Sequence, residues 1–499
     1  MLVASCPVVD IEREESHMWR FCVVLFLLNV AGWLSGCAPL PPEPDVSATF
    51  IPSPPAHSPL ASPTAVTTWS AVYGGQGFEE VEGLLVTDDG SLILTGATNS
   101  YSDDEQGDAW ILNLHGDGRV AWQRLYGSDG EDNIVDIRQT ADGGFVAVGM
   151  TDSFGAGQED LWVLRLDAQG DVMWSKTYGG PGVEQGWAVD LAPGGGYVVA
   201  GATTSFGAGG ADYWVLRLNR DGSVRWQRTL GGLQDDGGAS AYGEFVVRVL
   251  VDRDGNFVLA SETLSFARGE SDIWIVKLDS NGEILWQRAY GGEYEDSLWT
   301  FAEAAGGGYI LAGVTVSYSP DASGDTWVLR LNTDGSVRWQ KVFGLQGDWD
   351  EALTVGATRD GGALVGAYAE EGQADWDMVL LRVNEQGNLV WQRRYEYGWD
   401  WPTAVAEMPD GSLALAGVAW DKERGQDLDL WVMRLAADGT VGADCPVVQD
   451  VQFEVRTTAN APVETSAVVQ DTSVAPRVAP ITVRASSATP RYLCPAPTG

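Results

Sequence analysis

The stretch DLWVLRLDAQGDVMWSKTYGG (residues 160–180) contains the pattern that decides the fold. It combines an Asp-x-Trp element with a second element, a tryptophan usually followed by Gln-Arg and then Tyr-Gly-Gly. The second element returns in steps of 52 or 53 residues, with one step of 60. A fixed period of this length indicates a repeat architecture. The first element begins at Asp108, Asp160, Asp212, Asp272, Asp325, Asp377 and Asp429, and the second at Trp69, Trp122, Trp174, Trp226, Trp286, Trp339 and Trp391.

Each repeat predicts four short strands. In the second copy these are expected at 134–140, 145–151, 161–166 and 172–178, separated by turns and loops rich in Asp and Gly. Asp-Gly turns between apolar or alternating runs are strong hairpin signals. Seven groups of four antiparallel strands predict an all-β, seven-bladed β-propeller over residues 69–441. The last repeat lacks a fourth strand, so we expect the N-terminal strand at Trp69 to complete the seventh blade.

Two repeat units carry a resemblance to a known family. They read WVLRLNRDGSVRWQRTLGG and QTADGGFVAVGMTDSFGAGQEDLW, and they resemble the secreted bacterial and archaeal seven-bladed propeller-repeat proteins with YGG, DGG and AGxTxSFG motifs. The resemblance covers most of the chain. It implies the propeller fold and a surface or secreted location, and it implies no particular reaction.

Residues 1–36 are predicted to be an upstream extension followed by a lipoprotein signal peptide. Arg20 precedes an apolar run that is too short to span a bilayer and that ends in small residues, which is the layout of a secretory signal. The sequence Leu-Ser-Gly-Cys37 resembles the bacterial lipoprotein signal and implies cleavage before Cys37 and lipid attachment to its thiol. The acidic residues 1–17 favour a start at Met18, with a start at Met1 as the other possibility. A buried helix with a chance cysteine is the alternative to the signal peptide.

The next segment, residues 37–68, is predicted to be a lipid-anchored tether. It is rich in Pro, Ser, Thr and Ala and has too few large apolar residues to fold. We therefore expect an extracytoplasmic protein that is anchored to the bacterial cell envelope, at the outer membrane or the cell surface. The membrane is then one of its partners.

The tail, residues 442–499, is rich in Thr, Val, Ala and Pro and contains two cysteines. Of the five cysteines, Cys6 and Cys22 precede the cleavage site and Cys37 is acylated. The remaining pair, Cys445 and Cys494, is expected to form a disulfide in an oxidising compartment. Two unpaired thiols are the alternative.

Composition excludes several classes of function. The net charge of −40 repels nucleic acid and anionic lipid and favours cations or basic partners. Only one of the three histidines, His115, lies in the predicted propeller, which excludes histidine-based triads and multi-histidine metal sites. The glycine-rich stretches open no helix, so a phosphate cradle is not expected. No cofactor is expected, apart from one candidate cation.

That candidate is Ca²⁺. The long loops after Tyr-Gly-Gly and before Asp-x-Trp should share one rim of the propeller, and acidic residues recur there. One hypothesis is that clustered oxygen atoms bind Ca²⁺, with Asp350, Glu351 and Asp400 as weak candidates. The other is that these are solvated acidic loops.

Tryptophans at the repeated positions are expected to be framework, buried between blades. Ligand specificity should lie where the copies differ, including an insertion at 233–244 in the fourth blade. Aromatic rings beside carboxylates are typical of sites for neutral sugar chains or protein partners, although such rings can also pack against their own loops. The candidate rings are Trp187 and Trp299 at the channel mouth, and Trp349, Trp376, Tyr397, Trp399, Trp401 and Trp420 on the rim of blades six and seven.

These patterns favour a non-enzymatic binding or scaffolding module for an envelope polysaccharide or protein. One alternative is a carboxylate-based glycoside hydrolase or lyase, which needs a pair of acids in a deep pocket. The sequence shows no unique buried pair, so no catalytic residue is assigned. The other alternative is a purely structural surface protein.

Overall fold

The computed structural model describes most of the chain from residue 67 to residue 494. The described ranges are 67–102, 106–237, 246–320, 323–345, 347–370, 376–420, 428–442, 445 and 447–449, followed by short strands of the tail. The predicted signal peptide, Cys37 and the tether lie outside them, as does most of the insertion in the fourth blade. Within these ranges, no helix is long and apolar enough to cross a membrane.

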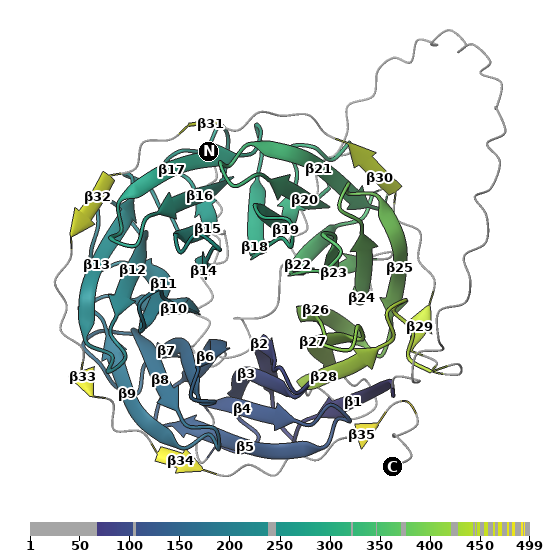
Figure 1. The fold of residues 1–499 in the computed structure, drawn as a ribbon, viewed down its shortest axis with the longest axis horizontal. Helices are drawn as coiled ribbons and strands as arrows, with labels where there is room; N and C mark the ends of the chain where they lie inside the picture. The colour runs from purple at the N-terminus through teal and green to yellow at the C-terminus, as the bar shows by residue number, and fades with distance from the viewer. Residues whose placement is uncertain are drawn as a thin grey trace, which may run out of the picture. The chain divides into compact units, whose positions relative to one another are not determined.

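Seven antiparallel sheets surround a central axis (Figure 1), and the predicted seven-bladed propeller is confirmed. Blade one consists of β2 (Glu79–Val86), β3 (Leu92–Thr98), β4 (Asp108–Leu114) and β5 (Val120–Gly127), from the axis outwards. Blade two contains β6 (Asp132–Gln139), β7 (Phe145–Thr151), β8 (Asp160–Leu166) and β9 (Val172–Tyr178), within two residues of the predicted bounds; blade three contains β10 (Glu184–Leu191), β11 (Tyr197–Thr203), β12 (Asp212–Leu218) and β13 (Val224–Gly231).

The other blades follow the same order. Blade four contains β14 (Arg248–Val251), β15 (Phe257–Thr263), β16 (Asp272–Leu278) and β17 (Ile284–Tyr290); blade five contains β18 (Asp296–Glu303), β19 (Tyr309–Thr315), β20 (Asp325–Leu331) and β21 (Val337–Gly344). Blade six contains β22 (Asp350–Ala357), β23 (Ala363–Glu370), β24 (Trp376–Val383) and β25 (Leu389–Tyr395); blade seven contains β26 (Trp399–Glu407), β27 (Leu413–Trp420), β28 (Leu428–Leu435) and β1 (Trp69–Tyr73).

The core lies between blades. The two middle strands of blade three, β11 and β12, are buried along their whole length, because each of their faces packs on a neighbouring blade. Trp214 of β12, for example, belongs to one apolar cluster with Val146 and Val148 of blade two. The predicted framework role of the Asp-x-Trp tryptophans is confirmed, since Trp162, Trp214 and the other four are at most 2% exposed.

The ring closes through its two chain ends, as predicted. All five residues of β1 pair with β28 in an unbroken register from Trp69↔Arg434 to Tyr73↔Leu430. The Tyr73 hydroxyl donates a hydrogen bond to the Gly118 carbonyl in the next blade, at 2.6 Å. Tyrosines at the same position in four other blades make the same bond to the following blade, so blade seven is joined to blade one as the others are joined to each other.

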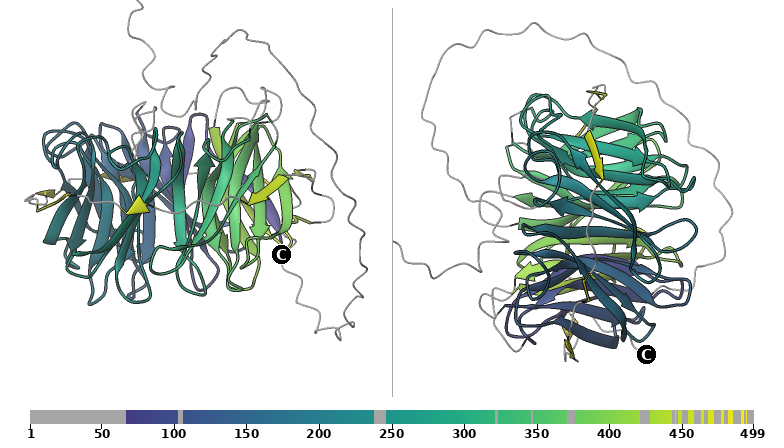
Figure 2. Two further views of the ribbon diagram at one scale, coloured as in Figure 1. Left: turned by 90° about the horizontal axis from the view of Figure 1, so that it is seen from above. Right: turned by 90° about the vertical axis from the view of Figure 1, so that its left-hand side faces the viewer.

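The tail adds a fifth strand to every blade, which the sequence did not predict. It runs round the outside of the ring against the order of the blades, from blade six back to blade one and then to blade seven (Figures 1 and 2). Each tail strand is antiparallel to the outermost strand of its blade. The tail strands are β29 (Val448–Gln449), β30 (Glu454–Thr457), β31 (Val463–Glu464), β32 (Val468–Asp471), β33 (Arg477–Val478), β34 (Thr482–Arg484) and β35 (Arg491–Tyr492).

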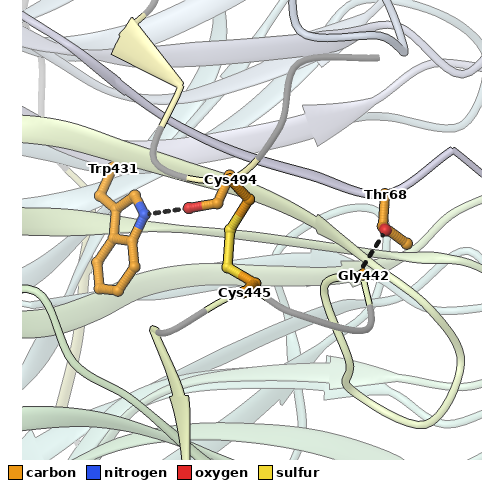
Figure 3. Close-up of a disulfide and its surroundings, with 6 residues drawn as sticks. Thr68, Trp431, Gly442, Cys445 and Cys494 are labelled. Carbon is orange, nitrogen blue, oxygen red and sulfur yellow. Dashed lines mark hydrogen bonds between the residues drawn. A yellow bond between two sulfur atoms is a disulfide. The ribbon is translucent and has the colours of Figure 1, made fainter. Parts of the chain in front are cut away.

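The predicted disulfide between Cys445 and Cys494 is confirmed (Figure 3). Cys445 precedes the first tail strand and Cys494 follows the last, so the bond joins the two ends of the circuit beside blade seven. Cys494 is buried, and both cysteines pack into a core cluster with Val72 of β1 and Trp431 of β28. The described strands of the tail therefore form a belt round the blades, and the disulfide joins its two ends.

Candidate functional site

The candidate aromatic residues lie on one rim. Successive strands of a blade are antiparallel, so their connections alternate between two rims, and the loops into each innermost strand share a rim with the loops between second and third strands. Trp399 and Trp401 lie at the start of β26, Trp420 ends β27 and Trp376 begins β24. All four belong to this long-loop rim, as the repeat pattern predicted.

The repeated rim acids are framework. Glu184, at the start of β10, is fully buried and accepts hydrogen bonds from the Gly180 amide (2.6 Å), the Thr203 hydroxyl (2.8 Å) and the Ser205 amide (3.1 Å). A buried carboxylate needs such donors, and a glycine-rich loop needs a fixed acceptor for its amides. The equivalent acids of the other blades, which are Glu79, Asp132, Asp236, Asp296, Asp350 and Asp400, accept the same kind of loop amide.

Two of the three calcium candidates, Asp350 and Asp400, belong to this framework. Asp350 accepts the Leu345 amide at 2.5 Å, and Asp400 accepts the Tyr397 amide at 2.6 Å. The third, Glu351, is surrounded by aromatic donors. Among the residues that the structure describes, no three His, Cys, Asp or Glu side chains are arranged to bind one metal ion. Calcium binding stays a prediction from composition.

The framework acids also repel one another in pairs. Burial and, to a smaller extent, the neighbouring Asp429 of the preceding blade raise the pKa of Glu79 to about 7. Burial likewise raises the pKa of Asp132 to about 6 and that of Asp296 to about 7, with Asp108 and Asp272 as the respective partners. Each pair joins the Asp-x-Trp aspartate of one blade to the first residue of the next innermost strand.

An aromatic sector, defined here as Tyr368, Trp376, Trp399, Trp401 and Trp420, occupies the rim of blades six and seven. Trp376 is the centre, with ring centroids 5.4 Å from Tyr368, 6.2 Å from Trp399 and 6.4 Å from Trp401. Trp399 in turn meets Trp420 edge to face at 4.6 Å. The four tryptophans are only partly buried, so they present apolar ring surface to solvent.

Glu351 connects this sector to two further candidate rings. Its carboxylate is 7% exposed and accepts hydrogen bonds from the Trp299 indole, the Trp349 indole (3.1 Å) and the Tyr368 hydroxyl (3.0 Å). The three donors come from β18, from the loop before β22 and from β23, in blades five and six. Glu351 thus holds aromatic rings from three segments of the chain.

Trp187 and Trp299 are each the extra residue of a β-bulge in an innermost strand, a feature that turns a side chain out of the strand's regular alternation. Trp187 is 7% exposed and packs on Val135 and Val246, with Trp299 against the same cluster. These residues come from blades two to five, so they meet at the inner strands around the axis. The structure places both rings in or against this packed cluster, and their position at a channel mouth stays a prediction.

Tyr397 is separated from the other candidates. Its ring lies 6.0 Å from that of Trp431 and packs against the apolar cluster that contains Val72 and Cys494. Tyr397 therefore supports the core beside blade seven, while its neighbours Trp399 and Trp401 form part of the aromatic sector.

Sequence reasoning missed three functional candidates. Tyr368 and Glu262 stand at the same position of the second strand, where the other blades have Ala97, Met150, Ala202, Val314 and Val418. Arg248 donates hydrogen bonds to the carbonyls of Trp299 (3.1 Å) and Trp187 (3.3 Å), and its guanidinium lies 5.9 Å from the Trp187 ring. Comparing the copies position by position would have found the first two.

Glu262 forms a unique group of acids with Glu351 and Glu295. Burial raises the pKa of Glu262 to about 8, with Glu295 and Glu351 adding to the rise and Ser297 opposing it as a hydrogen-bond donor. Burial also raises the pKa of Glu351 and of Glu295. Glu262 and Glu351 are both under 9% exposed, and the charge of Glu351 acts on Glu262 although the two residues lie far apart in sequence.

Comparisons with known proteins identify no family for this chain. No family model matches the chain, and no curated protein matches it. Among solved structures, Sqt1 from Chaetomium thermophilum is similar with a TM-score of 0.40 and 12% identity over 72% of this chain and 85% of that one. A puromycin hydrolase is similar with a TM-score of 0.39 and 13% identity over 74% of this chain and 55% of that one. Likenesses this distant carry no argument about function.

Proposed function

We propose that this chain is a lipid-anchored, extracytoplasmic binding or scaffolding module for an envelope polysaccharide or protein, with the aromatic sector as its contact surface. The signal-like sequence before Cys37 and the Pro-rich tether support the anchor and the location. The net charge of −40 favours a neutral or basic ligand over an anionic one.

The observation that carries this proposal is the continuous contact among Trp376, Trp399, Trp401 and Trp420 on one rim. In five other blades an aromatic residue of the loop between the second and third strands packs on the buried framework tryptophan instead, as Phe206 does on Trp214 at 5.7 Å. The four tryptophans of the sector are partly buried, and they do not occupy the Asp-x-Trp framework position. Such flat surfaces suit the apolar faces of sugar rings or an apolar side chain of a protein partner.

A polysaccharide array tests the proposal. The full chain is applied to immobilised neutral, basic and anionic polysaccharides and to envelope fractions, beside a Trp399→Ala/Trp401→Ala variant. Trp174→Ala is the matched control, because Trp174 is a partly buried tryptophan on the outer strand of blade two. We expect retention on at least one neutral or basic polymer or envelope fraction, a loss of at least about tenfold in the double variant and none in the control.

Two outcomes count against the proposed site. Retention that survives the double substitution removes the aromatic sector from consideration. Retention that is lost equally in Trp174→Ala points to general destabilisation of the propeller. The melting temperature of each variant separates these cases, since the double variant is expected to keep the wild-type transition to within a few degrees.

A carboxylate-based glycoside hydrolase is a second candidate because of Glu262. A carboxyl group whose pKa is about 8 keeps its proton at neutral pH and can act as a general acid. Glu295 is a nearby carboxylate, whereas Glu351 is occupied by three donors. Release of reducing sugar from a retained polymer, lost in Glu262→Gln, is the expected result for an enzyme; retention without release supports the binding module.

A further inference from the structure

The belt encloses every blade, although each of its strands is short. The strands range from two to four residues, and seven of them cover the outer edges of seven sheets. The disulfide joins the residue before the first strand to a residue after the last. Residues 445–494 therefore form a covalent ring around the propeller.

The two ends of this ring meet at the one blade that is built from both ends of the propeller chain. Blade seven combines β1 with β28. The Trp431 indole donates a hydrogen bond to the Ser70 hydroxyl at 2.8 Å, although the two residues are 361 positions apart in the sequence. The Gly442 amide also donates to the Thr68 hydroxyl at 3.0 Å (Figure 3). The disulfide lies at this joint, in the core cluster that contains Trp431.

At that joint β1 lies between two strands. One side pairs with β28 over five residues, and the other pairs with β35 through Ala71↔Tyr492 and Val72↔Arg491. Every other outermost strand is the continuation of a hairpin within its own blade, but β1 enters from the predicted tether. Without β35 it is an edge strand attached by one ladder only, which is the arrangement most prone to local opening.

We propose that residues 445–494 are a covalent hoop that keeps the propeller closed at blade seven, and that the disulfide is its clasp. An open tail with strands of two to four residues can detach one strand at a time. A closed ring cannot, because loosening one strand leaves both of its ends tied to neighbours, so the local concentration of each strand at its edge stays high. Opening the clasp frees the tail first at β35 and then exposes β1.

The redox step is an ordinary thiol–disulfide exchange. A dithiol reductant supplies two electrons and two protons, the bond between the sulfurs of Cys445 and Cys494 breaks, two thiols form, and the reductant becomes a disulfide. Cys494 is buried, so exchange requires attack on Cys445 or local opening of the joint. In the proposed anchored protein a pull from the tether enters through β1, and this consequence alone depends on the proposed function.

Hydrogen exchange of the full chain tests the hoop. Exchange of the β1 amides is compared with that of the β13 amides before and after reduction of the folded protein. Each strand has one belt partner, β35 for β1 and β32 for β13, but β13 is also tied to β12 by its hairpin. We expect the β1 amides to exchange at least about tenfold faster after reduction and the β13 amides to change less. Unchanged β1 protection, or an equal change in both strands, overturns the proposal.

Two variants separate the clasp from the strand contacts. Cys445→Ser/Cys494→Ser removes the clasp without a reductant and is expected to reproduce the fast exchange of β1. Val469→Pro interrupts a single belt contact, Leu230↔Val469 in blade three, with the clasp intact, and is expected to affect β13 and leave β1 protected. Fast exchange of β1 in the proline variant contradicts the hoop. If the double variant does not fold, reduction of the folded wild-type chain decides the question.

Discussion

The first two strands of blades three and seven pair in the same backbone register, but the side chains at equivalent positions make different contacts. In blade three the Thr203 hydroxyl, at the end of the second strand, donates to the framework acid Glu184 at 2.8 Å. In blade seven Ala419 pairs with Asp400 at the equivalent place, so no hydroxyl is present there. Blade three encloses its loop aromatic residue against a buried tryptophan, whereas blade seven presents Trp399 and Trp420 at the rim.

The difference separates tryptophans that fill a repeated framework position from tryptophans that occur in one sector only. A residue that fills the same position in nearly every copy supports packing that every blade needs. A residue that occurs in one sector only is not part of the packing that every blade shares. The rim of blades six and seven also differs from the rest in its framework, because the alanines at 369 and 419 stand where blades one to five have threonine.

The largest contrast is expected between two tryptophan deletions. Trp214→Ala removes a fully buried indole between blades and is expected to cost about 4 kcal/mol of unfolding free energy. Trp399→Ala removes a partly exposed ring and is expected to cost about 1 kcal/mol. Denaturant unfolding of the two variants measures both values, and equal losses would contradict the division into framework and site.

The next effect is a dependence of stability on pH. Burial raises the pKa of Glu79 and of Asp296 to about 7 and that of Asp132 to about 6, so the folded protein binds protons more tightly than the unfolded chain does. Stability should therefore increase as the pH falls from 8 through these pKa values towards about 4.5. Melting temperatures between pH 8 and pH 5 check this, and a flat or opposite trend contradicts it.

Replacement of Glu262 sharpens the same comparison. Glu262, whose pKa is about 8, is not one of the repeated framework acids. Glu262→Gln should therefore reduce the loss of stability as the pH rises from 5 to about 8, because over this range the folded protein keeps the proton on Glu262 and the unfolded chain does not. The matched control is Asp296→Asn, which is expected to reduce the dependence only below about pH 7, so the interval between pH 7 and pH 8 distinguishes the two variants.

The smallest effect concerns the threonine contact itself. Thr203→Ala removes one buried donor to Glu184 and is expected to cost about 1 kcal/mol, since the carboxylate keeps its two backbone donors. Ser223→Ala, in an exposed turn, is the control and is expected to be neutral. If Thr203→Ala is also neutral, the missing hydroxyls of blades six and seven say nothing about a site.

Much of the fold was predictable, because each blade repeats a local pattern. The strands of blade two agree with the predicted bounds to within two residues, and the role of β1 followed from the missing strand of the last repeat. Part of the candidate site was predictable for the opposite reason, since Trp376, Trp399, Trp401 and Trp420 depart from the repeat. Tyr397 could not be distinguished from these residues, because it lies only two positions before Trp399 and such a small shift decides whether a ring packs in the core or lies at the rim.

The sequence by itself determined the seven blades, the closing strand and the cysteine pair, since these depend on period, turn residues and count. Only the tertiary structure decided that Glu351 binds Trp299, Trp349 and Tyr368, because these residues converge from two blades. Only the tertiary structure showed the tail as a hoop, since each of its strands is too short to be recognised alone and is stabilised by the edge of a blade far away in sequence.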